Sequence, residues 1–509
     1  MPQYLLAHDL GTSGNKAVLY TPEGRLVASR NCPYDTRFFN GNWAEQEPQD
    51  WWRAICVSTQ ELLREAQADA SEVAVVALSG QMMGCTPVDR EGNALRPSIL
   101  YCDQRAVKEA AEILSKIDLK SFYAIAGHRV SPSYTIEKLM WIRDNEPEIY
   151  ARTHKTLFAK DYINCRLTGR MATDFSDATG ANAFDVRSFR WSEELIDLAG
   201  VDGEMFPEAL ESTAILGTVT SQAARETGLK EGTPVAAGGG DGSCAGVGVG
   251  CIKPGSAYNY LGSSSWVGLT VTEPIVDEQM RTMNWAHCVP GYLHPSGTMQ
   301  TAGSSHSWLK NTLCQVEVQE GAAKGVSPYE LIDEAVARVP AGSHGVLFLP
   351  YMLGERTPWW NPNARGAFVG LSLATRREEM LRAVIEGITL NLGIIVNIFR
   401  RHVPIDAMTV IGGGARSAVW RQIMADVYGC PIQSLNFLEE ATSMGAAVIG
   451  GVAAGLFPDF EVIHRFVRVD HTAEPDVESQ KVYARLMPVF EQTYRSLVGV
   501  YEELARLAL

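Results

Sequence analysis

The feature that most constrains this chain of 509 residues is a strand–turn–strand pattern that occurs near its start and returns half a chain later. In the first copy, the apolar residues 4–7 and 17–20 flank a turn with the sequence DLGTSGNK, residues 9–16. In the second copy, residues 258–261 and 266–271 flank the turn GSSS, residues 262–265. A pattern that returns at this interval predicts two related domains, each of which lends a hairpin to a shared cleft.

The length of the chain supports the same division, because 509 residues exceed what one hydrophobic core usually serves. We expect the first domain to span residues 1–246 and the second residues 247–509, with the boundary in the glycine-rich run 238–250. An amphipathic segment at residues 51–66 precedes a strand-like run at residues 73–78. This alternation predicts an α/β architecture in which helices cover the sheets.

Composition narrows the partners and the compartment. The formal net charge of -15 disfavours binding to nucleic acid or to an anionic membrane surface. Ten scattered cysteines without a C-x-x-C pair predict reduced thiols and no zinc site. The start of the chain lacks the pattern of a signal peptide, which predicts a cytoplasmic protein. The apolar stretch 445–457 is short and rich in Gly and Ala, which favours close helix packing over a membrane span.

A run of glycines, GGGDG at residues 238–242, delivers a single carboxylate directly after the apolar residues 234–237. There, Asp241 can accept a proton from a hydroxyl that is held in line with a phosphate. Alternatively, Asp241 caps a helix that starts near Gly242, as Asp commonly does. A second carboxylate with its own glycine turn, Asp9 in the first hairpin, favours the catalytic interpretation.

The first hairpin turn combines small residues, two hydroxyls and Lys16, which together form a concave anion site for phosphate oxygens. Asp9 at the end of the preceding strand can hold Mg²⁺ through water, because this ion prefers few carboxylates and keeps much of its hydration. The alternative is a simple glycine-rich hairpin turn. No Walker motif is present in the sequence.

A third glycine turn, GGGARS at residues 412–417, follows a strand-like pair and precedes a helical pattern that starts near Ala418. A strand, a glycine turn and a helix N-terminus give a nucleotide close access to the backbone. A tight turn without a ligand is the alternative.

Tyr101 and Asp103 end another strand-like run. An aromatic ring against C–H groups and a carboxylate that accepts hydroxyl protons suit a sugar. The alternative is a surface pair of Asp103 and Arg105 that opens a helix from Ala106.

The chain resembles the FGGY carbohydrate kinases nearly from end to end, and within them it is most similar to the xylulokinases. The resemblance rests on SYTIEKLMWIRDN at residues 133–145, and on GAFVGL at residues 366–371 with AVIE at residues 383–386. Further similar stretches are WW at 51–52, KDY at 160–162, LPY at 349–351 and GERTP at 354–358. The resemblance implies an α/β fold of two actin-like, ribonuclease-H-type ATPase domains, with ATP and a sugar meeting in the central cleft.

The same resemblance assigns roles to single residues. Asp241 is implied as the catalytic base that takes the proton of the attacking sugar hydroxyl, and Asp9 as the residue that holds Mg²⁺ through water. Nucleotide contacts are implied for Thr12, Ser13, Lys16, Ser263, Gly303, Gly413, Gly414 and Ser417. Substrate contacts are expected from Met82, Met83, Tyr101, Asp103 and Asp241.

Four positions of the expected sugar pocket depart from the xylulokinase pattern. Met83 stands where His is usual, so a thioether replaces a hydrogen-bonding imidazole. Tyr101 replaces a Trp, and Cys102 and Gly242 each replace an Asn. The resemblance implies an ATP-dependent kinase whose leading reaction converts D-xylulose to D-xylulose 5-phosphate. Because of these departures in the sugar pocket, ribulose and erythritol-type polyols are alternative substrates.

Two other functions are less consistent with the sequence. A glycerol kinase calls for an Arg-Glu pair at the position of Met82 and Met83, and that pair is absent. An actin-like or chaperone-like ATPase is the alternative from another class, which Asp241 and the two long signatures disfavour. The expected partners are ATP and a small sugar. Association into a homodimer is compatible with the sequence.

Overall fold

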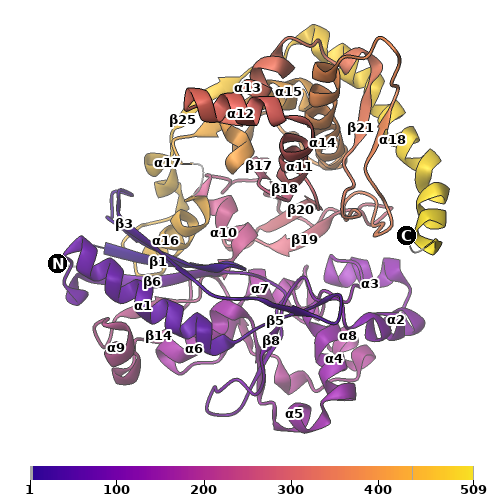
Figure 1. The fold of residues 1–509 in the computed structure, drawn as a ribbon. Coiled ribbons are helices and arrows are strands. Elements are labelled where there is room, and N and C mark those ends of the chain that lie inside the picture. The colour runs from indigo at the N-terminus through magenta and orange to yellow at the C-terminus, as the bar shows by residue number, and fades with distance from the viewer. Residues whose placement is uncertain (1–3, 438–439, 508–509) are drawn as a thin grey trace.

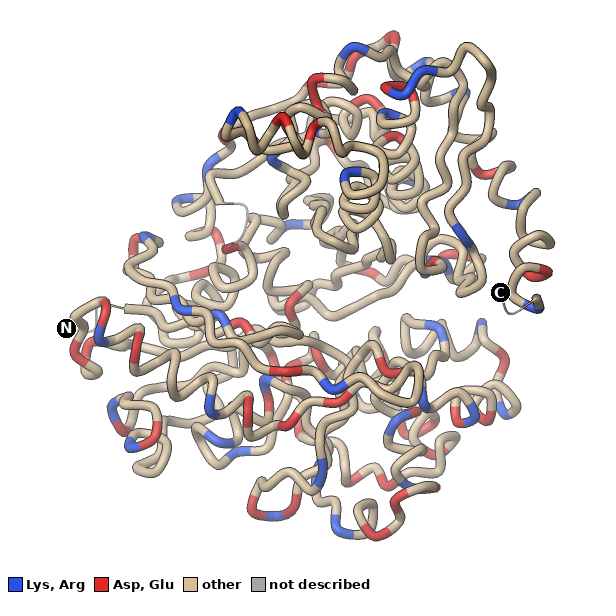
Figure 2. The backbone as a smooth tube through the Cα atoms, viewed as in Figure 1, with Lys and Arg blue, Asp and Glu red and all other residues tan. Residues whose placement is uncertain are grey.

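The computed structural model describes residues 4–437 and 440–507, which form two lobes (Figure 1). The first half of the chain builds one lobe and the second half builds the other, and each lobe contains a seven-stranded sheet covered by helices. Acidic and basic residues are interspersed over both lobes (Figure 2). The two helix-covered sheets confirm the predicted α/β class.

The sheet of the first lobe runs in the order β14-β15-β6-β1-β2-β3, and the short β16 also pairs with β6. β1 pairs antiparallel with β2 and parallel with β6. Its strands are β1 (Tyr4–Leu10), β2 (Gly14–Tyr20), β3 (Leu26–Pro33), β6 (Val73–Gly80), β14 (Ile215–Thr218), β15 (Pro234–Ala236) and β16 (Gly239–Gly240).

The sheet of the second lobe runs in the order β19-β20-β18-β17-β23-β24-β25. β17 pairs antiparallel with β18 and parallel with β23, as β1 does with β2 and β6. Its strands are β17 (Ala257–Leu261), β18 (Ser265–Leu269), β19 (Met283–Ala286), β20 (Leu293–Met299), β23 (Met408–Ile411), β24 (Ile432–Leu435) and β25 (Val469–Ala473). The two sheets therefore share one topology, which explains why the hairpin pattern occurs twice in the sequence.

Helices and short strands complete the lobes. The first half contains α1 (Pro48–Ala66), α2 (Val107–Lys116), α3 (Leu119–Ala126), α4 (Thr135–Asn145), α5 (Pro147–Arg152), α6 (Ala159–Thr168), α7 (Phe175–Thr179), α8 (Glu193–Ala199), α9 (Ser221–Thr227) and α10 (Asp241–Gly248). The second half contains α11 (Gly303–Leu313), α12 (Gln315–Lys324), α13 (Pro328–Ala337), α14 (Arg377–Arg400), α15 (Ala418–Tyr428), α16 (Ala441–Ala453), α17 (Ile463–Phe466) and α18 (Val477–Arg506). Small sheets are formed by β4 (Arg37–Phe39), β5 (Trp43–Gln46) and β8 (Ser98–Ile99), by β7 (Thr86–Val88) and β9 (Lys155–Leu157), by β10 (Ala172–Asp174) and β13 (Glu208–Leu210), by β11 (Phe184–Asp185) and β12 (Arg190–Trp191), and by β21 (Leu347–Leu349) and β22 (Ala367–Val369).

Helix α1 shows how sequence signals fix an element of the first lobe. It starts with Pro48 in its first turn, where the missing N–H of proline costs nothing. Trp51, Ile55 and Leu62 recur at helical spacing and are buried in the core beside β2 and β3. The helix ends at Ala66 and is capped by Gln67, whose φ of 51° is left-handed. The predicted amphipathic segment 51–66 is thereby confirmed.

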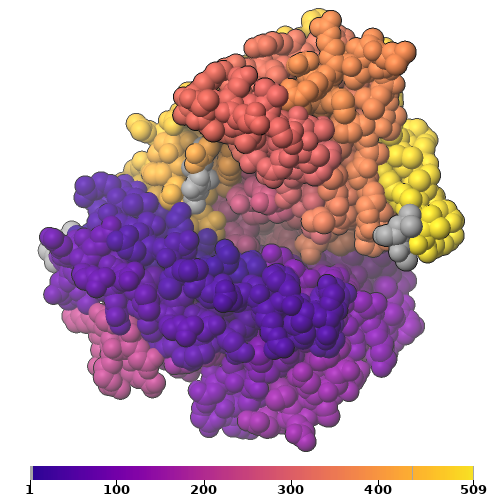
Figure 3. Space-filling view, in the orientation of Figure 1, coloured from indigo at the N-terminus to yellow at the C-terminus, as the bar shows by residue number. Residues whose placement is uncertain are grey.

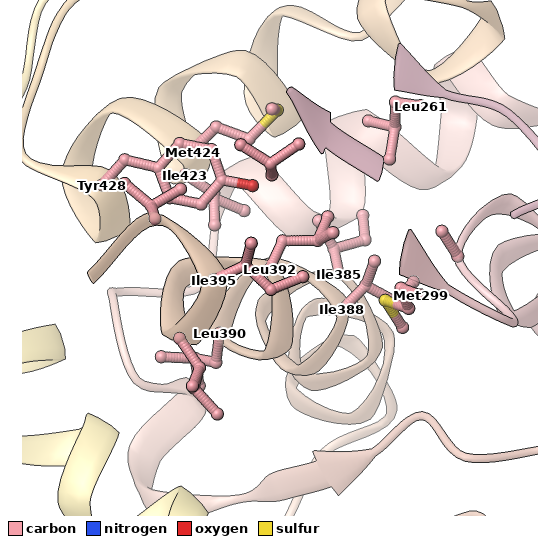
Figure 4. Close-up of a cluster of buried hydrophobic side chains, with 14 of the residues drawn as sticks. Leu261, Met299, Ile385, Ile388, Leu390, Leu392, Ile395, Ile423, Met424 and Tyr428 are labelled. Carbon is pink, nitrogen blue, oxygen red and sulfur yellow. The ribbon is translucent and has the colours of Figure 1, made fainter. Parts of the chain in front are cut away.

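Helix α14 forms the centre of the second lobe. Figure 4 shows Ile385, Ile388 and Leu392 of this helix packed near Leu261 of β17 and Met299 of β20. Within the part of the chain that is described, α14 alone is long and apolar enough to cross a membrane, but 94% of its most apolar window is buried inside the protein. Its composition is that of a core helix.

The two lobes meet where α10 crosses α16. A Cβ atom added to Gly248 would lie 1.7 Å from the carbonyl oxygen of Ala441, and one added to Gly445 would lie 1.9 Å from that of Cys244. Only glycine permits backbones to approach so closely. α16 also packs against β1 and β6 of the first sheet. The predicted boundary between residues 246 and 247 falls inside α10, and it stays a prediction.

Candidate active site

A cavity of about 360 Å³ lies between the lobes and takes its walls from both halves of the chain. The space-filling view shows the surface hollowed where the lobes meet (Figure 3). Five predicted site residues line the cavity, namely Thr12, Met82, Met83, Tyr101 and Asp241. The second half contributes Trp266, Met283, Trp285, His294, Gln300 and Arg356, among others. Residues far apart in the sequence are thus brought to one site.

Asp241 stands at the start of α10, directly after the two-residue strand β16. β16 pairs with the end of β6, so the carboxylate is delivered at the edge of the first sheet. Gly240, and not Asp241, is the residue that caps the helix. The Asp241 Oδ1 atom instead accepts the N–H of Gly242 at 2.7 Å. The alternative of a capping aspartate is therefore not what the structure contains.

The surroundings of Asp241 change its acidity. Burial and, to a smaller extent, the negative charge of Asp9 raise the pKa of Asp241, the hydrogen bond from Gly242 lowers it, and together they bring the pKa to about 7. A carboxyl group with a pKa near neutrality is well matched to proton transfer at neutral pH.

Asp9 lies in β1 opposite Lys16 in β2, at the mouth of the first hairpin. The Ser79 hydroxyl donates a hydrogen bond of 3.1 Å to Asp9 Oδ1. Burial raises the pKa of Asp9, while Ser79 and Lys16 lower it. Lys16 Nζ lies 3.4 Å from Glu440 Oε1, at the start of α16, so this hairpin touches the other lobe.

The described residues contain no group of three or more His, Cys, Asp and Glu side chains that could hold a metal ion alone. A single carboxylate such as Asp9 is nevertheless the donor set that Mg²⁺ uses when water and phosphate oxygens fill its other positions. The residues present therefore fit a magnesium ion that arrives with a nucleotide.

The second hairpin turn is held against the start of α11. The carbonyl of Gly262 accepts the N–H of Gly303 at 2.8 Å, and the carbonyl of Ser263 accepts those of Ala302 and Ser304. A Cβ on Gly303 would lie 2.4 Å from the Gly262 oxygen. Glycine at position 303 thus allows the helix to begin on the turn, and the Ser263 side chain remains exposed.

The third glycine turn lies beside the second hairpin, because its glycines are in close contact with Leu261 at the end of β17. A Cβ on Gly414 would lie 2.5 Å from the Leu261 side chain, whereas one on Gly413 would meet no atom within 4 Å. Ser417 caps α15 through its hydroxyl, which accepts the N–H of Trp420 at 3.0 Å. α15 begins at Ala418, as predicted. Open space for a ligand is therefore found at Gly413, while Ser417 already has a structural task.

The expected sugar pocket has an apolar wall that is fixed from behind. Met83 has a φ of 61°, a left-handed conformation, and its carbonyl accepts a hydrogen bond of 2.8 Å from the buried Lys138. Met82, Met83, Met283 and Trp285 pack together in one apolar cluster. Tyr101 packs against the same cluster, and its hydroxyl accepts a hydrogen bond of 3.3 Å from the Thr12 hydroxyl.

Asp103 requires a correction. It is fully buried, does not line the cavity, and its two oxygens bond Arg105 through the Nε and Nη2 atoms. The same carboxylate accepts the N–H of Ala44 at 2.6 Å, and Arg105 also pairs with Glu45 at 2.8 Å. The Asp103–Arg105 pair is the alternative weighed from the sequence, in a buried rather than a surface position. Its carboxylate is committed to the fold and not turned toward a sugar.

Several polar side chains line the cavity that were not expected there, among them Gln81, His294 and Arg356. Gln81 Oε1 and His294 Nδ1 are buried without a hydrogen-bond partner among the described residues. No ion pair of Arg356 is found in the described part of the chain, and its neighbour Glu355 accepts the backbone N–H groups of Gln300 and Arg356. Arg356 stands in the stretch GERTP noted from the sequence and Gln81 directly precedes Met82, an expected substrate contact, whereas nothing in the sequence pointed to His294.

Known proteins match the chain over almost its whole length. The N-terminal domain of the FGGY family of carbohydrate kinases matches residues 4–248, and the C-terminal domain of that family matches residues 257–454. The xylulose kinase of Staphylococcus epidermidis is 32% identical over 501 residues, which cover 97% of each chain. The gluconokinase of Bacillus licheniformis is 28% identical, over 99% of this chain and 98% of that protein.

Among solved structures, the ligand-bound xylulose kinase from Lactobacillus acidophilus superposes with a TM-score of 0.91 at 26% identity, over 98% of this chain and 99% of that one. The two lobes thus have the actin-like, ribonuclease-H-like ATPase fold that the resemblance implied. The family match makes the protein a phosphotransferase that uses ATP and acts on an alcohol group of a sugar. The chain belongs to the FGGY family of carbohydrate kinases.

Proposed function

We propose that the protein transfers the γ-phosphoryl group of ATP to the terminal hydroxyl of a ketopentose, with D-xylulose to D-xylulose 5-phosphate as the leading reaction. The observation that carries this proposal is Asp241, a carboxyl group with a pKa of about 7 in a cavity between the lobes. The full-length similarity to a protein named xylulose kinase supports the choice of sugar.

In this reaction Asp241 acts as the general base. Its carboxylate takes the proton of the sugar hydroxyl, the hydroxyl oxygen forms a bond to the γ-phosphorus, and the bond from that phosphorus to the bridging oxygen breaks. ADP leaves with the electron pair of the broken bond. Magnesium, when bound, neutralises charge on the phosphates, and Asp9 would hold it through water.

The nucleotide is placed by the three glycine turns. In this proposal Thr12, Ser13 and Lys16 contact the phosphates from the first lobe, and Ser263 contacts them from the second. Gly303 and the 412–417 turn form the adenosine side, where Gly413 leaves room for a ligand and Gly414 and Ser417 keep the turn in place. Domains of residues 1–246 and 247–509 would then supply the sugar side and most of the nucleotide side.

The cavity walls suit a flexible polyhydroxy chain. Met83 offers no hydrogen bond where related kinases carry an imidazole, but the polar residues Gln81 and His294 line the same cavity. An apolar wall discriminates between similar sugars weakly, by roughly 1–3 kcal/mol. Ribulose and erythritol-type polyols are therefore secondary substrates within the same proposal.

One observation favours a second candidate, a kinase for a sugar acid such as gluconate. Arg356 lines the cavity without a carboxylate partner in the described chain, and a guanidinium group pairs readily with the carboxylate of a ligand. A relative named gluconokinase matches the chain from end to end.

A coupled assay of ADP release tests these candidates against one another. We expect D-xylulose to give the highest kcat/KM in a panel with D-ribulose, erythritol and D-gluconate. The variant Arg356→Gln serves as the control, because it should lower kcat/KM for gluconate about tenfold or more while D-xylulose changes less. A higher kcat/KM for gluconate in the native protein would replace the leading reaction, and ATP turnover that ignores every sugar would indicate an ATPase.

Met83→His should shift preference toward D-xylulose, because it returns a hydrogen-bonding ring to the pocket. Histidine tolerates left-handed backbone better than most residues, so the turn should persist. The measurement is the ratio of kcat/KM for D-xylulose to that for the best alternative sugar. An unchanged ratio in an enzyme that already prefers D-xylulose would show that position 83 does not select the sugar.

A further inference from the structure

A cluster of four ionisable side chains is buried beneath the loop that carries Asp241. Lys160 Nζ lies 2.5 Å from Asp161 Oδ1, 2.9 Å from Asp174 Oδ1 and 3.1 Å from Asp177 Oδ2. All four side chains have no exposed surface. Burial raises the pKa of Asp177 well above its ordinary value, against the attraction of Lys160.

Burying such a cluster of charges has a large desolvation cost in free energy. An apolar filling of the same volume would often give equal or greater stability than a buried set of charges. None of the four groups lines the cavity between the lobes. Packing stability alone therefore does not explain why the four charged groups are buried here, which indicates a functional role.

The cluster is connected to the catalytic loop by a hydroxyl group. The Ser176 hydroxyl donates to Asp174 Oδ2 at 2.5 Å and accepts the backbone N–H of Gly240 at 2.8 Å. Gly240 is the residue immediately before Asp241 and caps α10. A continuous path of hydrogen bonds and one ion pair thus runs from Lys160 through Asp174 and Ser176 to the backbone that holds the proposed base.

The loop needs such a support because glycines cannot anchor it by side chains. A Cβ on Gly239 would lie 2.4 Å from the sulfur of Cys288, and one on Gly240 would lie 2.6 Å from the end of Met82. The loop is therefore restricted to glycine by its neighbours, and its position depends on backbone hydrogen bonds.

We propose that Ser176, held by Asp174 and Lys160, is a positioning residue that fixes Asp241 through the N–H of Gly240. The inference rests on the proposed role of Asp241 as general base. A misplacement of the base by about 1 Å can cost a factor of about 100 in rate without weakening substrate binding. Loss of the Ser176 hydroxyl should therefore lower kcat and leave KM nearly unchanged.

The chain provides a matched control in Ser212. Its hydroxyl donates to the same Asp174 Oδ2 atom at 2.7 Å, and it is 2% exposed, but in the described part of the chain the side-chain hydrogen bond to Gly240 comes from Ser176 and not from Ser212. Its link to the loop is a backbone one, since its carbonyl accepts the N–H of Gly238, and alanine would retain that bond. Ser176→Ala and Ser212→Ala thus remove equal hydrogen bonds from Asp174 and differ in the contact with Gly240.

The experiment compares kcat, the KM values for ATP and sugar, and thermal unfolding in the two variants, with the sugar that the native enzyme uses best. We expect Ser176→Ala to lower kcat about 10- to 100-fold with both KM values within about twofold. We expect Ser212→Ala to lower kcat less than about threefold, with a similar shift in unfolding temperature. If Ser176→Ala does not accumulate, Ser176→Cys replaces it, because a thiol is only a weak donor and acceptor.

Equal losses of kcat in the two variants would overturn the proposal, because they would trace the effect to Asp174 alone. Native kcat in both variants would overturn it as well. Asp241→Asn is measured in parallel to separate this inference from the function on which it rests. If Asp241→Asn keeps its turnover, the proposed base is wrong; if it is inactive while Ser176→Ala is fully active, only the positioning role fails.

Discussion

The two hairpins at the cleft have the same backbone and different chemistry. In the first, β1 and β2 place Asp9 directly opposite Lys16, one pair before the turn. In the second, β17 and β18 place Tyr260 opposite Trp266 at the matching pair, with ring centroids stacked 4.1 Å apart. One copy of the unit therefore brings charges to the cleft, and the other brings an aromatic stack.

The two helices that cross between the lobes differ in the same way. α10 of the first lobe begins with Asp241, whereas α16, which occupies the matching place in the second lobe, begins with Ala441. A repeated fold has thus been specialised: the first lobe holds Asp9 and Asp241, and the second lines the cavity with Arg356, His294 and aromatic and hydroxyl side chains. Each prediction below changes one side of this comparison and states what the other side should do.

The largest effect is expected at Asp241. Asp241→Asn removes the proton acceptor and should lower kcat by about two to four decades, while the affinity for ATP and the fold change little. Sugar-dependent ADP release and nucleotide binding by calorimetry measure the two sides. Turnover at the native rate would remove Asp241 from the chemistry and would make the asymmetry between α10 and α16 a matter of packing.

A smaller effect is expected from the charged hairpin. Asp9→Ala should raise the magnesium concentration needed for half-maximal activity and lower kcat/KM for MgATP about 10- to 100-fold, because a contact to a charged group is lost. Titration of activity with Mg²⁺ is the measurement. The control is Trp266→Phe in the second hairpin, for which we expect the native magnesium dependence. If Asp9→Ala also shows the native curve, Asp9 is a structural residue of the turn.

The second hairpin should respond more weakly. Ser263→Ala removes one neutral hydroxyl and should raise KM for ATP by about two- to tenfold, because an uncharged hydrogen bond contributes about 0.5–1.5 kcal/mol. The same assay on Lys16→Ala gives the charged counterpart, with a larger expected rise. An equal rise in both variants would contradict the division of labour between the hairpins.

The smallest effect concerns pH. The raised pKa of Asp241 means that the carboxyl group is protonated below about pH 7, so kcat/KM for the sugar should fall as the pH drops through that value. Asp9→Asn removes the negative charge that raises this pKa, so the midpoint of the fall should move to lower pH. A pH profile of both proteins checks the shift. Identical midpoints would show that the two carboxylates of the first lobe do not interact.

The sequence predicted the hairpins better than it predicted their neighbours. Strand boundaries were drawn where apolar residues end, but β1 continues to Leu10 and β2 starts at Gly14, because strand pairing is a property of the backbone. Asp9 and Lys16 thus became cross-strand neighbours and not turn residues. The helix starts at Asp241 and Ala418 lay within one residue of their predicted places, since glycine turns mark them locally.

What could not be predicted depends on contacts between distant parts of the chain. The role of Asp103 follows from Ala44 and Glu45 on a strand that local patterns do not connect to it. Arg356 and His294 reach the cavity only because the second lobe folds over the first. Local periodicity and motif spacing contain no signal for such encounters.

The crossing of α10 and α16 bears on how descendants of such a chain can diverge. Any side chain larger than hydrogen at Gly248 or Gly445 would force the lobes apart and shift α10, with Asp241 at its head, whatever the substrate. Neither glycine lines the cavity, and Met83 and Tyr101, which do, lie outside the crossing. Substitutions in the cavity wall can therefore change the sugar specificity while the helix crossing stays the same. The position of Asp241 need not change when the substrate does.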